Sequence, residues 1–280
     1  MNYRHAFHAG NFADVFKHAV LARIIEYLKR KEAPFRVIDT HAGRGIYDLA
    51  SVEAGKTGEW INGIGKISTA RITGNASDLL APYLSTVSGD GGEPDQYPGS
   101  PVIARRLLRK QDRLSAFELH PEDHAELAAL FAGDWQARIN LLDGWLVSGA
   151  HLPPKEKRGL VLIDPPFEKA GEFDRMIDAL QKGERRWPGG IFMLWYPLKH
   201  DGEVERFISA LRGSAIRDLI RVELQVKKAS PEPGLYGSGL IIKNPPFVLK
   251  EELESILPVL TTEMAQDAGA DWRFERLTEE

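Results

Sequence analysis

The stretch FRVIDTHAGRG, residues 35–45, runs from a short apolar strand directly into a turn that contains Gly43 and Gly45. A glycine turn at the end of the first sheet strand lets the backbone approach a ligand closely. The same residues also suit a tight turn that binds nothing. A dinucleotide site normally has a third glycine, and Asp48 occupies that position here. The stretch therefore indicates the start of an α/β unit and leaves the ligand open.

Strands and helices alternate along the sequence after Leu114. Because single helices separate most successive strands, we expect a doubly wound, mostly parallel sheet that is covered on both faces. The connection at residues 229–237 is too short for a parallel crossover, so the last predicted strand should be antiparallel to its predecessor. The predicted strands cover residues 35–39, 114–119, 139–143, 159–164, 189–197, 219–226 and 238–244.

The composition is that of an ordinary globular protein, with 280 residues of which 43% are hydrophobic and 27% are charged. This length accommodates one elaborated α/β domain or two small ones. No apolar run is long enough to span a bilayer, and the first residues do not look like a secretory signal. The absence of cysteine excludes disulfides and thiolate metal sites and fits a reducing compartment. We therefore expect a cytoplasmic protein without membrane contact.

The histidines raise the question of a metal site, and the basic residues raise the question of a nucleic-acid partner. His5, His8 and His18 would fit a metal site, but no further histidine or carboxylate stands at ligand spacing, so we expect no metal. The net charge of −4 argues mildly against a nucleic-acid partner. However, residues 105–113, RRLLRKQDR, carry five basic residues against Asp112. Such a cluster is either a phosphate-binding surface or the solvated face of an amphipathic element.

Acidic residues follow two of the predicted strands. In open α/β sheets, ligands bind beyond the carboxyl ends of the strands. A carboxylate such as Glu118 can accept hydrogen bonds from both hydroxyls of a ribose, although it also suits a solvated strand end. Asp143-Gly144 is placed to meet the amine of an adenine, although Asp-Gly is also a common turn pair.

The sharpest motif is Asp164-Pro165-Pro166-Phe167, which follows the apolar run GLVLI. The two prolines fix the backbone and leave carbonyl groups free to accept hydrogen bonds. An aspartate beside those carbonyls can hold both protons of an exocyclic amine and aim its lone pair at an electrophilic methyl group. Phe167 can stack on a planar base that has left its helix. The motif therefore indicates methyl transfer to the amine of a base, against the alternative of a proline-terminated core strand.

Together these sites resemble those of the N6-adenine amino-methyltransferases. Further motifs, spread over nearly the whole chain, resemble one family within that group. YRHAFHAGNFADVFKH (3–18), DTHAGRG (39–45), TGE (57–59), YPGSP (97–101), ELHP (118–121), LIDPPF (162–167), LWYP (194–197) and GSGLIIKNPP (237–246) are similar to the bacterial 23S ribosomal RNA adenine-N6 methyltransferase J family. One departure is His41, which stands where such enzymes often carry glycine and is therefore a candidate cofactor contact itself.

The resemblance implies one methyltransferase domain over residues 1–280. It would consist of an N-terminal motif and helix (1–34), a small helical insertion at about residues 46–100, and a Rossmann-like core. It further implies that S-adenosylmethionine is the cofactor and that Asp164 is catalytic. Tyr3, His5 and Lys17 would lie on the substrate side, with Phe167 against the base. Cofactor contacts would fall on His18, His41, Ser100, Glu118, Asp143, Gly144 and Asp164.

The predicted function is methyl transfer from S-adenosylmethionine to N6 of a specific adenine in 23S ribosomal RNA by a monomeric enzyme. The same chemistry on another RNA, on DNA or on a protein glutamine is an alternative, because D-P-P-F reads only a planar amine. A non-catalytic RNA-binding protein on the same fold is a second alternative, and a dinucleotide-dependent oxidoreductase is a distant third.

A second copy of the motif, Asn244-Pro245-Pro246-Phe247, is an equally good catalytic signature by composition. Topology separates the two. Asp164 follows a strand that should be parallel to the one carrying the glycine turn, so it should emerge at the ligand edge of the sheet. Asn244 ends the last predicted strand, which should be antiparallel, so it should emerge at the opposite edge.

Overall fold

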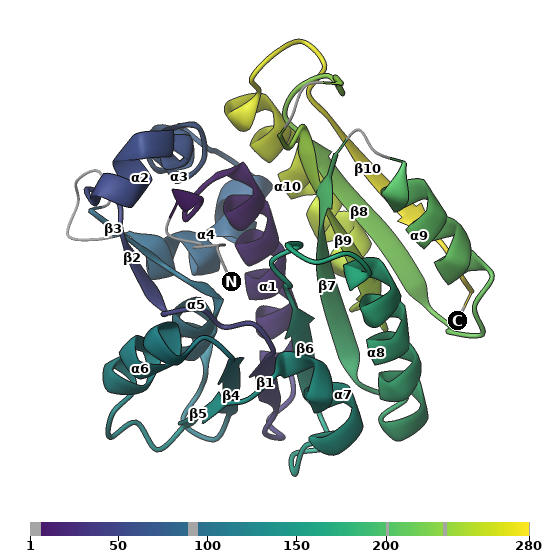
Figure 1. Ribbon diagram of the computed structural model, residues 1–280. Coiled ribbons are helices and arrows are strands. Elements are labelled where there is room, and N and C mark those ends of the chain that lie inside the picture. The colour runs from purple at the N-terminus through teal and green to yellow at the C-terminus, as the bar shows by residue number, and fades with distance from the viewer. Residues whose placement is uncertain (1–6, 89–94, 200–201, 232–233, 280) are drawn as a thin grey trace.

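An eight-stranded sheet forms the centre of the molecule (Figure 1). The computed structural model describes residues 7–88, 95–199, 202–231 and 234–279. Five adjacent strands of the sheet, in the order β7, β6, β1, β4 and β5, are parallel to one another. Strands β9 and β10 run antiparallel to their neighbours. The predicted fold class is thereby confirmed. In order across the sheet, the strands are β10 (Asp271–Arg276), β8 (Leu219–Gln225), β9 (Gly237–Lys243), β7 (Ile191–Leu198), β6 (Gly159–Ile163), β1 (Arg36–Asp39), β4 (Arg113–Glu118) and β5 (Ala137–Leu141).

Helices cover both faces of this sheet, and successive residues of a central strand are therefore buried in different apolar cores. In β1, Val37 belongs to one apolar core and Ile38 to the other. Within the described ranges, no helix is long and apolar enough to cross a membrane. The helices packed on the Val37 side are α1 (Phe12–Lys29), α4 (Asn75–Val87), α5 (Ser100–Leu107), α6 (Pro121–Leu130) and α10 (Leu249–Met264). Those on the Ile38 side are α7 (Val147–Ala150), α8 (Glu172–Arg186) and α9 (Glu203–Arg212).

The chain makes a long excursion between β1 and α5 before it returns to the sheet. A two-stranded antiparallel ribbon of β2 and β3 forms the base of this excursion. The helices that connect the two strands in sequence lie beside α1 and α10 (Figure 1). The elements are β2 (Ile46–Asp48), α2 (Val52–Thr57), the 3-10 helix η2 (Glu59–Asn62), α3 (Ile64–Thr69), α4 and β3 (Gln96–Pro98).

The amino-terminal helix α1 begins directly after Asn11. The Asn11 side chain accepts hydrogen bonds from the backbone amides of Ala13 and Asp14, which satisfies two donors that the first turn would otherwise leave free. Most of α1 is buried, including the charged side chains of Lys17 and Arg23. A buried lysine requires a compensating partner, and α1 therefore points to polar contacts inside the molecule.

The prediction that Asn244 ends the last strand is wrong, because the residues after it are also structured. They form α10 and the edge strand β10, so Asn244 ends β9, which is not the last strand. Helix α10 has a proline at position 258, which weakens its pattern as a helix. Strand β10 is polar and only partly buried, so it lacks the apolar run of a central strand.

Candidate active site

A pocket opens at the carboxyl ends of β1, β4 and β6, beside α1 and the starts of α5 and α8. Eight residues expected to bind cofactor or substrate line this pocket, although they come from separate parts of the chain. They are Lys17, His18, His41, Ser100, Glu118, Asp143, Gly144 and Asp164. Tyr3 and His5 lie outside the described residues, so their predicted positions on the substrate side stay predictions.

The turn after β1 forms one wall of the pocket. Gly43 has a φ of 62°, which favours glycine, and a side chain there would collide with the hydroxyl group of Tyr47. Gly144, in the segment that follows β5, approaches the same turn. A Cβ at Gly144 would collide with the carbonyl oxygen of Thr40. Both glycines therefore allow a close fit of backbone segments around the pocket.

Glu118 connects two backbone segments at the end of β4. Its Oε2 accepts a hydrogen bond from the Gly43 amide at 2.8 Å, and its Oε1 accepts one from the His120 amide at 2.7 Å. A carboxylate has about four acceptor positions, so these two bonds orient the group and leave acceptor capacity for a ligand. The neighbouring Leu119 also lines the pocket and is 48% exposed, which gives the pocket an apolar surface beside the carboxylate.

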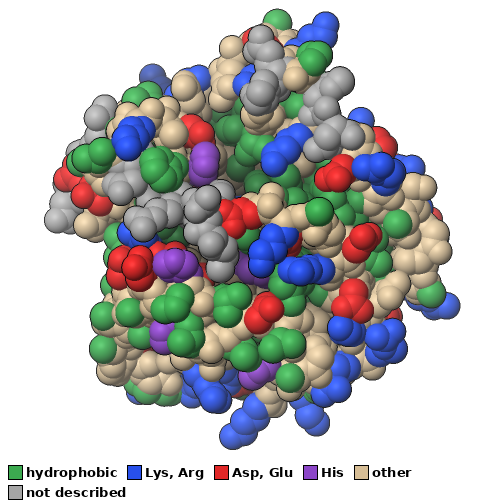
Figure 2. Space-filling model, in the orientation of Figure 1, with side chains coloured by type: hydrophobic (Ala, Val, Ile, Leu, Met, Phe, Trp, Pro, Cys, Tyr) green, Lys and Arg blue, Asp and Glu red, His purple; other side chains and the backbone are tan. Residues whose placement is uncertain are grey.

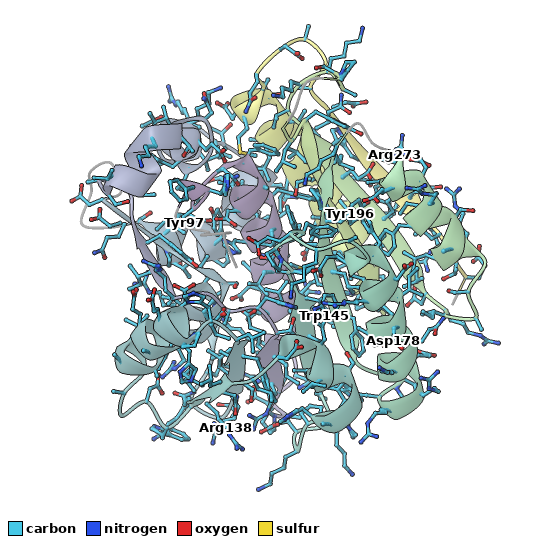
Figure 3. All side chains as sticks on the ribbon, viewed as in Figure 1. Tyr97, Arg138, Trp145, Asp178, Tyr196 and Arg273 are labelled. Carbon is cyan, nitrogen blue, oxygen red and sulfur yellow. The ribbon has the colours of Figure 1, made fainter. Side chains whose placement is uncertain are left out.

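Asp143 and Trp145 form a third part of the pocket wall. Asp143 Oδ1 accepts a hydrogen bond from the Trp145 amide at 3.0 Å and caps the 3-10 helix η3 (Gly144–Leu146). The Trp145 ring, labelled in Figure 3, meets His41 edge to face at 5.1 Å between ring centroids. Burial lowers the pKa of His41 to about 4, although the charges of Asp164 and Asp143 act in the other direction. His41 therefore presents a neutral imidazole at neutral pH.

Ser100 reaches the pocket at the start of α5 and is held by Asp39 at the end of β1. The Ser100 hydroxyl donates to Asp39 Oδ2 at 2.6 Å. Burial raises the pKa of Asp39 to about 7, against the opposing effect of this hydrogen bond. Asp39 is 1% exposed and contacts the pocket through Ser100, a contact that was not predicted from the sequence.

Asp164 is anchored by Lys17 from α1. Lys17 Nζ donates to Asp164 Oδ2 and also contacts Asp14 Oδ1 at 2.9 Å. Burial disfavours the charged amine, but the two carboxylates outweigh this effect and raise the pKa of Lys17. Trp195 lies beside the ion pair, with its ring centroid 5.6 Å from Lys17 Nζ. The predicted catalytic group is therefore fixed by a lysine that was expected on the substrate side.

His18 is held from the excursion between β1 and α5. Its Nδ1 forms a 2.7 Å hydrogen bond with the hydroxyl of Tyr97, which in turn lies 3.0 Å from the hydroxyl of Tyr83. Both tyrosines are fully buried. This chain of hydrogen bonds links the pocket to β3 and α4. Neither tyrosine was identified from the sequence, because nothing in the linear order of the chain pairs position 18 with position 97.

Phe167 is the last residue of the D-P-P-F motif but does not line this pocket. Its φ of 51° is unusual for an aromatic residue and turns the side chain toward a neighbouring pocket. There the ring lies 5.0 Å from Phe173 and 5.7 Å from Trp195, both measured between centroids. The contact of Phe167 with a substrate base stays a prediction, and the aromatic neighbours add Trp195 as a candidate.

Asn244 lies at the opposite edge of the sheet from Asp164, as the strand directions predict. Its side-chain amide donates to the carbonyl oxygens of Pro188 at 2.6 Å and Gly190 at 2.8 Å, just before β7 begins. Strand β9 is antiparallel to β7, so its carboxyl end lies beside the amino end of β7. Asn244 therefore closes a backbone turn far from the pocket.

The basic cluster at residues 105–113 is not brought to the pocket. Arg105 pairs with Asp134, and Arg109 pairs with Asp112 while donating to the carbonyl oxygens of Lys29 and Lys31. These residues lead into the amino end of β4, whereas Glu118 and the pocket lie at its carboxyl end. The structure therefore does not support a role for this cluster beside the site.

Two other cations line the pocket near α8. Lys169 and Arg175 are both exposed and reach the pocket from the loop after the D-P-P-F motif and from the first turn of α8. Figure 2 shows Lys and Arg side chains gathered at the centre of this face, over the start of α8. Among the described residues, no group of three or more His, Asp and Glu side chains could hold a metal ion.

Comparisons with known proteins agree with this geometry. The profile of the family described as "Ribosomal RNA large subunit methyltransferase D, RlmJ" matches residues 32–278. The protein "Ribosomal RNA large subunit methyltransferase J" of Escherichia coli (strain K12) is 41% identical over 269 residues, which cover 94% of each chain. The protein with the same name from Haemophilus influenzae (strain ATCC 51907 / DSM 11121 / KW20 / Rd) is 39% identical over 280 residues and 100% of each chain.

A solved structure has the same fold over nearly the whole chain. Protein LPL1258 from Legionella pneumophila str. Philadelphia 1 is 34% identical and superimposes with a TM-score of 0.86. The match covers 96% of the present chain and 98% of that protein. The sheet, the excursion after β1 and the carboxyl-terminal elements are thus shared features of related chains.

Proposed function

Because the chain belongs to the RlmJ family of ribosomal RNA large subunit methyltransferases, we propose that it transfers the methyl group of S-adenosylmethionine to N6 of one adenine in 23S ribosomal RNA. The observation that carries the proposal is the position of Asp164-Pro165 at the carboxyl end of β6. There it lies in the same pocket as Glu118 and Asp143.

The residues of the pocket fit S-adenosylmethionine. Glu118 would accept hydrogen bonds from the two ribose hydroxyls, because its carboxylate is already oriented by two backbone amides. Asp143 would accept from the adenine amine, between the apolar surfaces of Leu119 and Trp145. The methionine end would lie toward Ser100 and the neutral ring of His41. His18 and Gly144 would complete the set of contacts.

The bound cofactor supplies an electrophilic methyl group, and the chain must present the nucleophile to it. Asp164 Oδ2 is held by Lys17, so Oδ1 is the acceptor for one proton of the target amine. The carbonyl oxygen of Pro165 accepts the second proton, because it is freed by the proline that follows it. Holding both protons aligns the nitrogen lone pair, and alignment supplies much of the rate in such a transfer.

The target base must leave its helix to reach Asp164. Phe167 and Trp195 would contact the flipped adenine, and Tyr3 and His5 would approach from the amino terminus. We place the reaction in the cytoplasm with a monomer as the active unit, and the absence of cysteine fits that compartment. Residues 1–280 would act as one methyltransferase domain, with residues 46–100 as its helical insertion.

The test is methyl transfer from tritiated S-adenosylmethionine to deproteinised 23S RNA, followed by digestion and chromatography of the nucleosides. The proposal predicts that the label is recovered as N6-methyladenosine. Label on a different nucleoside, or transfer to DNA with no transfer to 23S RNA, would contradict the proposed substrate.

A further inference from the structure

Glu172 is a buried acidic side chain for which the mechanism above has no use. It is the first residue of α8 and is only 4% exposed. Among the residues that the structure describes, none donates a hydrogen bond to its Oε2. A buried carboxyl oxygen without a donor is unfavourable, because it has lost its hydrogen bonds to water and gained none in return. A ligand that brings a donor would remove this cost.

Glu172 also lines the pocket described above, and it is close enough to Asp143 for the charge of Asp143 to act on it. The two side chains arrive from different elements, Asp143 from the turn after β5 and Glu172 from the start of α8. Figure 1 shows α8 beginning at the end of the sheet where β6 finishes, and Trp145, labelled in Figure 3, lines the same pocket as Glu172. The pocket is therefore bordered by two carboxyl groups near Trp145.

Burial and neighbouring charges together change the pKa of Glu172. Burial is the main cause of its raised pKa, and the charges of Asp143 and Glu168 act in the same direction. Arg175 and Lys169 oppose them from the same helix and the preceding loop. Two neighbouring carboxylates repel each other unless a donor lies between them. A group with two protons in divergent directions would satisfy both at once, and the exocyclic amine of adenine is such a group.

We propose that Glu172 is a specificity-determining residue of the cofactor pocket and accepts one proton of the adenine amine while Asp143 accepts the other. The inference rests on the proposed function, since it takes the adenine of S-adenosylmethionine as the ligand. Hypoxanthine carries a carbonyl oxygen in place of the amine, and this oxygen would face two carboxylates. A site built to bind an amine rejects such an analogue because its buried acceptors are then left unpaired.

Calorimetric titration with S-adenosylhomocysteine and with S-inosylhomocysteine, its deaminated analogue, tests the proposal. We expect the wild-type protein to prefer the adenine compound. Glu172→Gln should reduce this preference by about tenfold or more, because a neutral amide accepts more weakly and can itself donate to the hypoxanthine oxygen. Glu172→Ala should weaken binding of the adenine compound. Asp174→Asn is the matched control, because Asp174 is an exposed acid in the same helical turn and should leave both affinities unchanged.

The pH dependence gives a second readout. A protonated Glu172 is a weaker acceptor and can itself donate, so the affinity of the wild-type protein for S-adenosylhomocysteine should fall as the pH is lowered. Glu172→Gln should flatten this dependence. Circular dichroism shows whether each variant is folded. If Glu172→Ala does not fold, the comparison of Glu172→Gln with the wild-type protein tests the role of Glu172.

The possible results separate the inference from the function on which it rests. An unchanged preference in folded Glu172→Gln, or an equal loss of affinity for both compounds, would overturn the role of Glu172 and leave the cofactor assignment intact. If the wild-type protein binds neither compound, the proposed cofactor is wrong and the inference fails with it.

Discussion

Lys17 in α1 donates a hydrogen bond to Asp164 at the end of β6, across 147 positions of sequence. The lysine is buried, and Asp14 on its own helix contacts it as well. The amino-terminal motif therefore has a direct structural connection to the D-P-P-F motif. Because the contact fixes one oxygen of the carboxylate that we propose to be catalytic, changes in α1 should affect methyl transfer.

Replacing this lysine tests the connection. Lys17→Met leaves two buried carboxylates without their shared cation, and breaking a buried pair typically lowers the free energy of unfolding by about 3–5 kcal/mol. We expect methyl transfer to fall by about a hundredfold, because the carboxylate would lose its fixed position. Lys29→Met, which removes a partly exposed pair with Glu26 in the same helix, should change the free energy of unfolding by about 1 kcal/mol or less. Denaturant unfolding and single-turnover transfer would measure both effects. Equal behaviour of the two variants would refute the account.

Glu118→Ala should weaken S-adenosylmethionine binding by about tenfold or more, because a hydrogen bond to a charged group contributes roughly 1.5–3 kcal/mol. The variant also removes the acceptor of the Gly43 and His120 amides. Glu122→Ala, at an exposed position in the next helix, is the control and should bind normally. Calorimetric titration of the folded proteins with S-adenosylmethionine measures both affinities. An unchanged affinity in Glu118→Ala would show that this residue is not part of the binding site.

The half-buried His41 should destabilise the protein in acid. Burial lowers its pKa to about 4 from 6.5, so between these values the unfolded chain binds a proton that the folded chain does not. The free energy of unfolding should therefore fall as the pH drops from about 6.5 toward 4. His41→Gln should reduce this fall, measured by urea unfolding at a series of pH values. A fall of the same size in the variant would show that His41 is protonated in the folded state.

Asp39 should act in the opposite direction over an overlapping range, because burial raises its pKa to about 7. The folded chain then holds a proton that the unfolded chain has lost, and stability decreases as the pH rises toward 7. The two effects partly cancel in the wild-type protein. For this reason the comparison of His41→Gln with wild type is more informative than the wild-type curve alone.

Binding of 23S RNA should depend on Lys169 and Arg175 and much less on the cluster at residues 105–113. Each phosphate contact adds about 0.7–0.9 to the slope of the log–log plot of affinity against salt. The double variant Lys169→Ala/Arg175→Ala should therefore reduce the slope, measured by filter binding. Arg105→Ala/Arg109→Ala is the matched control, because both arginines are already paired with aspartates. A reduced slope only in the control pair would reverse the assignment of the RNA-binding face.

The sequence predicts the groups at strand ends well, because the carboxyl ends of parallel strands meet at one edge of a sheet. Glu118, Asp143 and Asp164 each follow an apolar run and meet in one pocket. Partners that depend on packing were missed. Nothing in the linear order pairs Lys17 with Asp164 or Tyr97 with His18.

The sequence left two interpretations of the basic cluster at residues 105–113 open, and the structure shows only that the cluster does not line the pocket. The turn before β4 places these arginines beside Asp112, Asp134 and the end of α1. The last elements were missed for a different reason. Helix α10 contains a proline and β10 is largely polar, so neither has the apolar pattern on which prediction depends.

The central claim is that Asp164 directs methylation of N6 of one adenine in 23S ribosomal RNA. Its most direct test is a map of N6-methyladenosine in 23S RNA from cells with and without the gene. The account predicts that one modified adenine loses its methyl group in the deletion strain. A plasmid carrying the wild-type chain or Asn244→Ala should restore it, and Asp164→Ala should not. An unchanged map in the deletion strain would contradict the account, and so would restoration by Asp164→Ala.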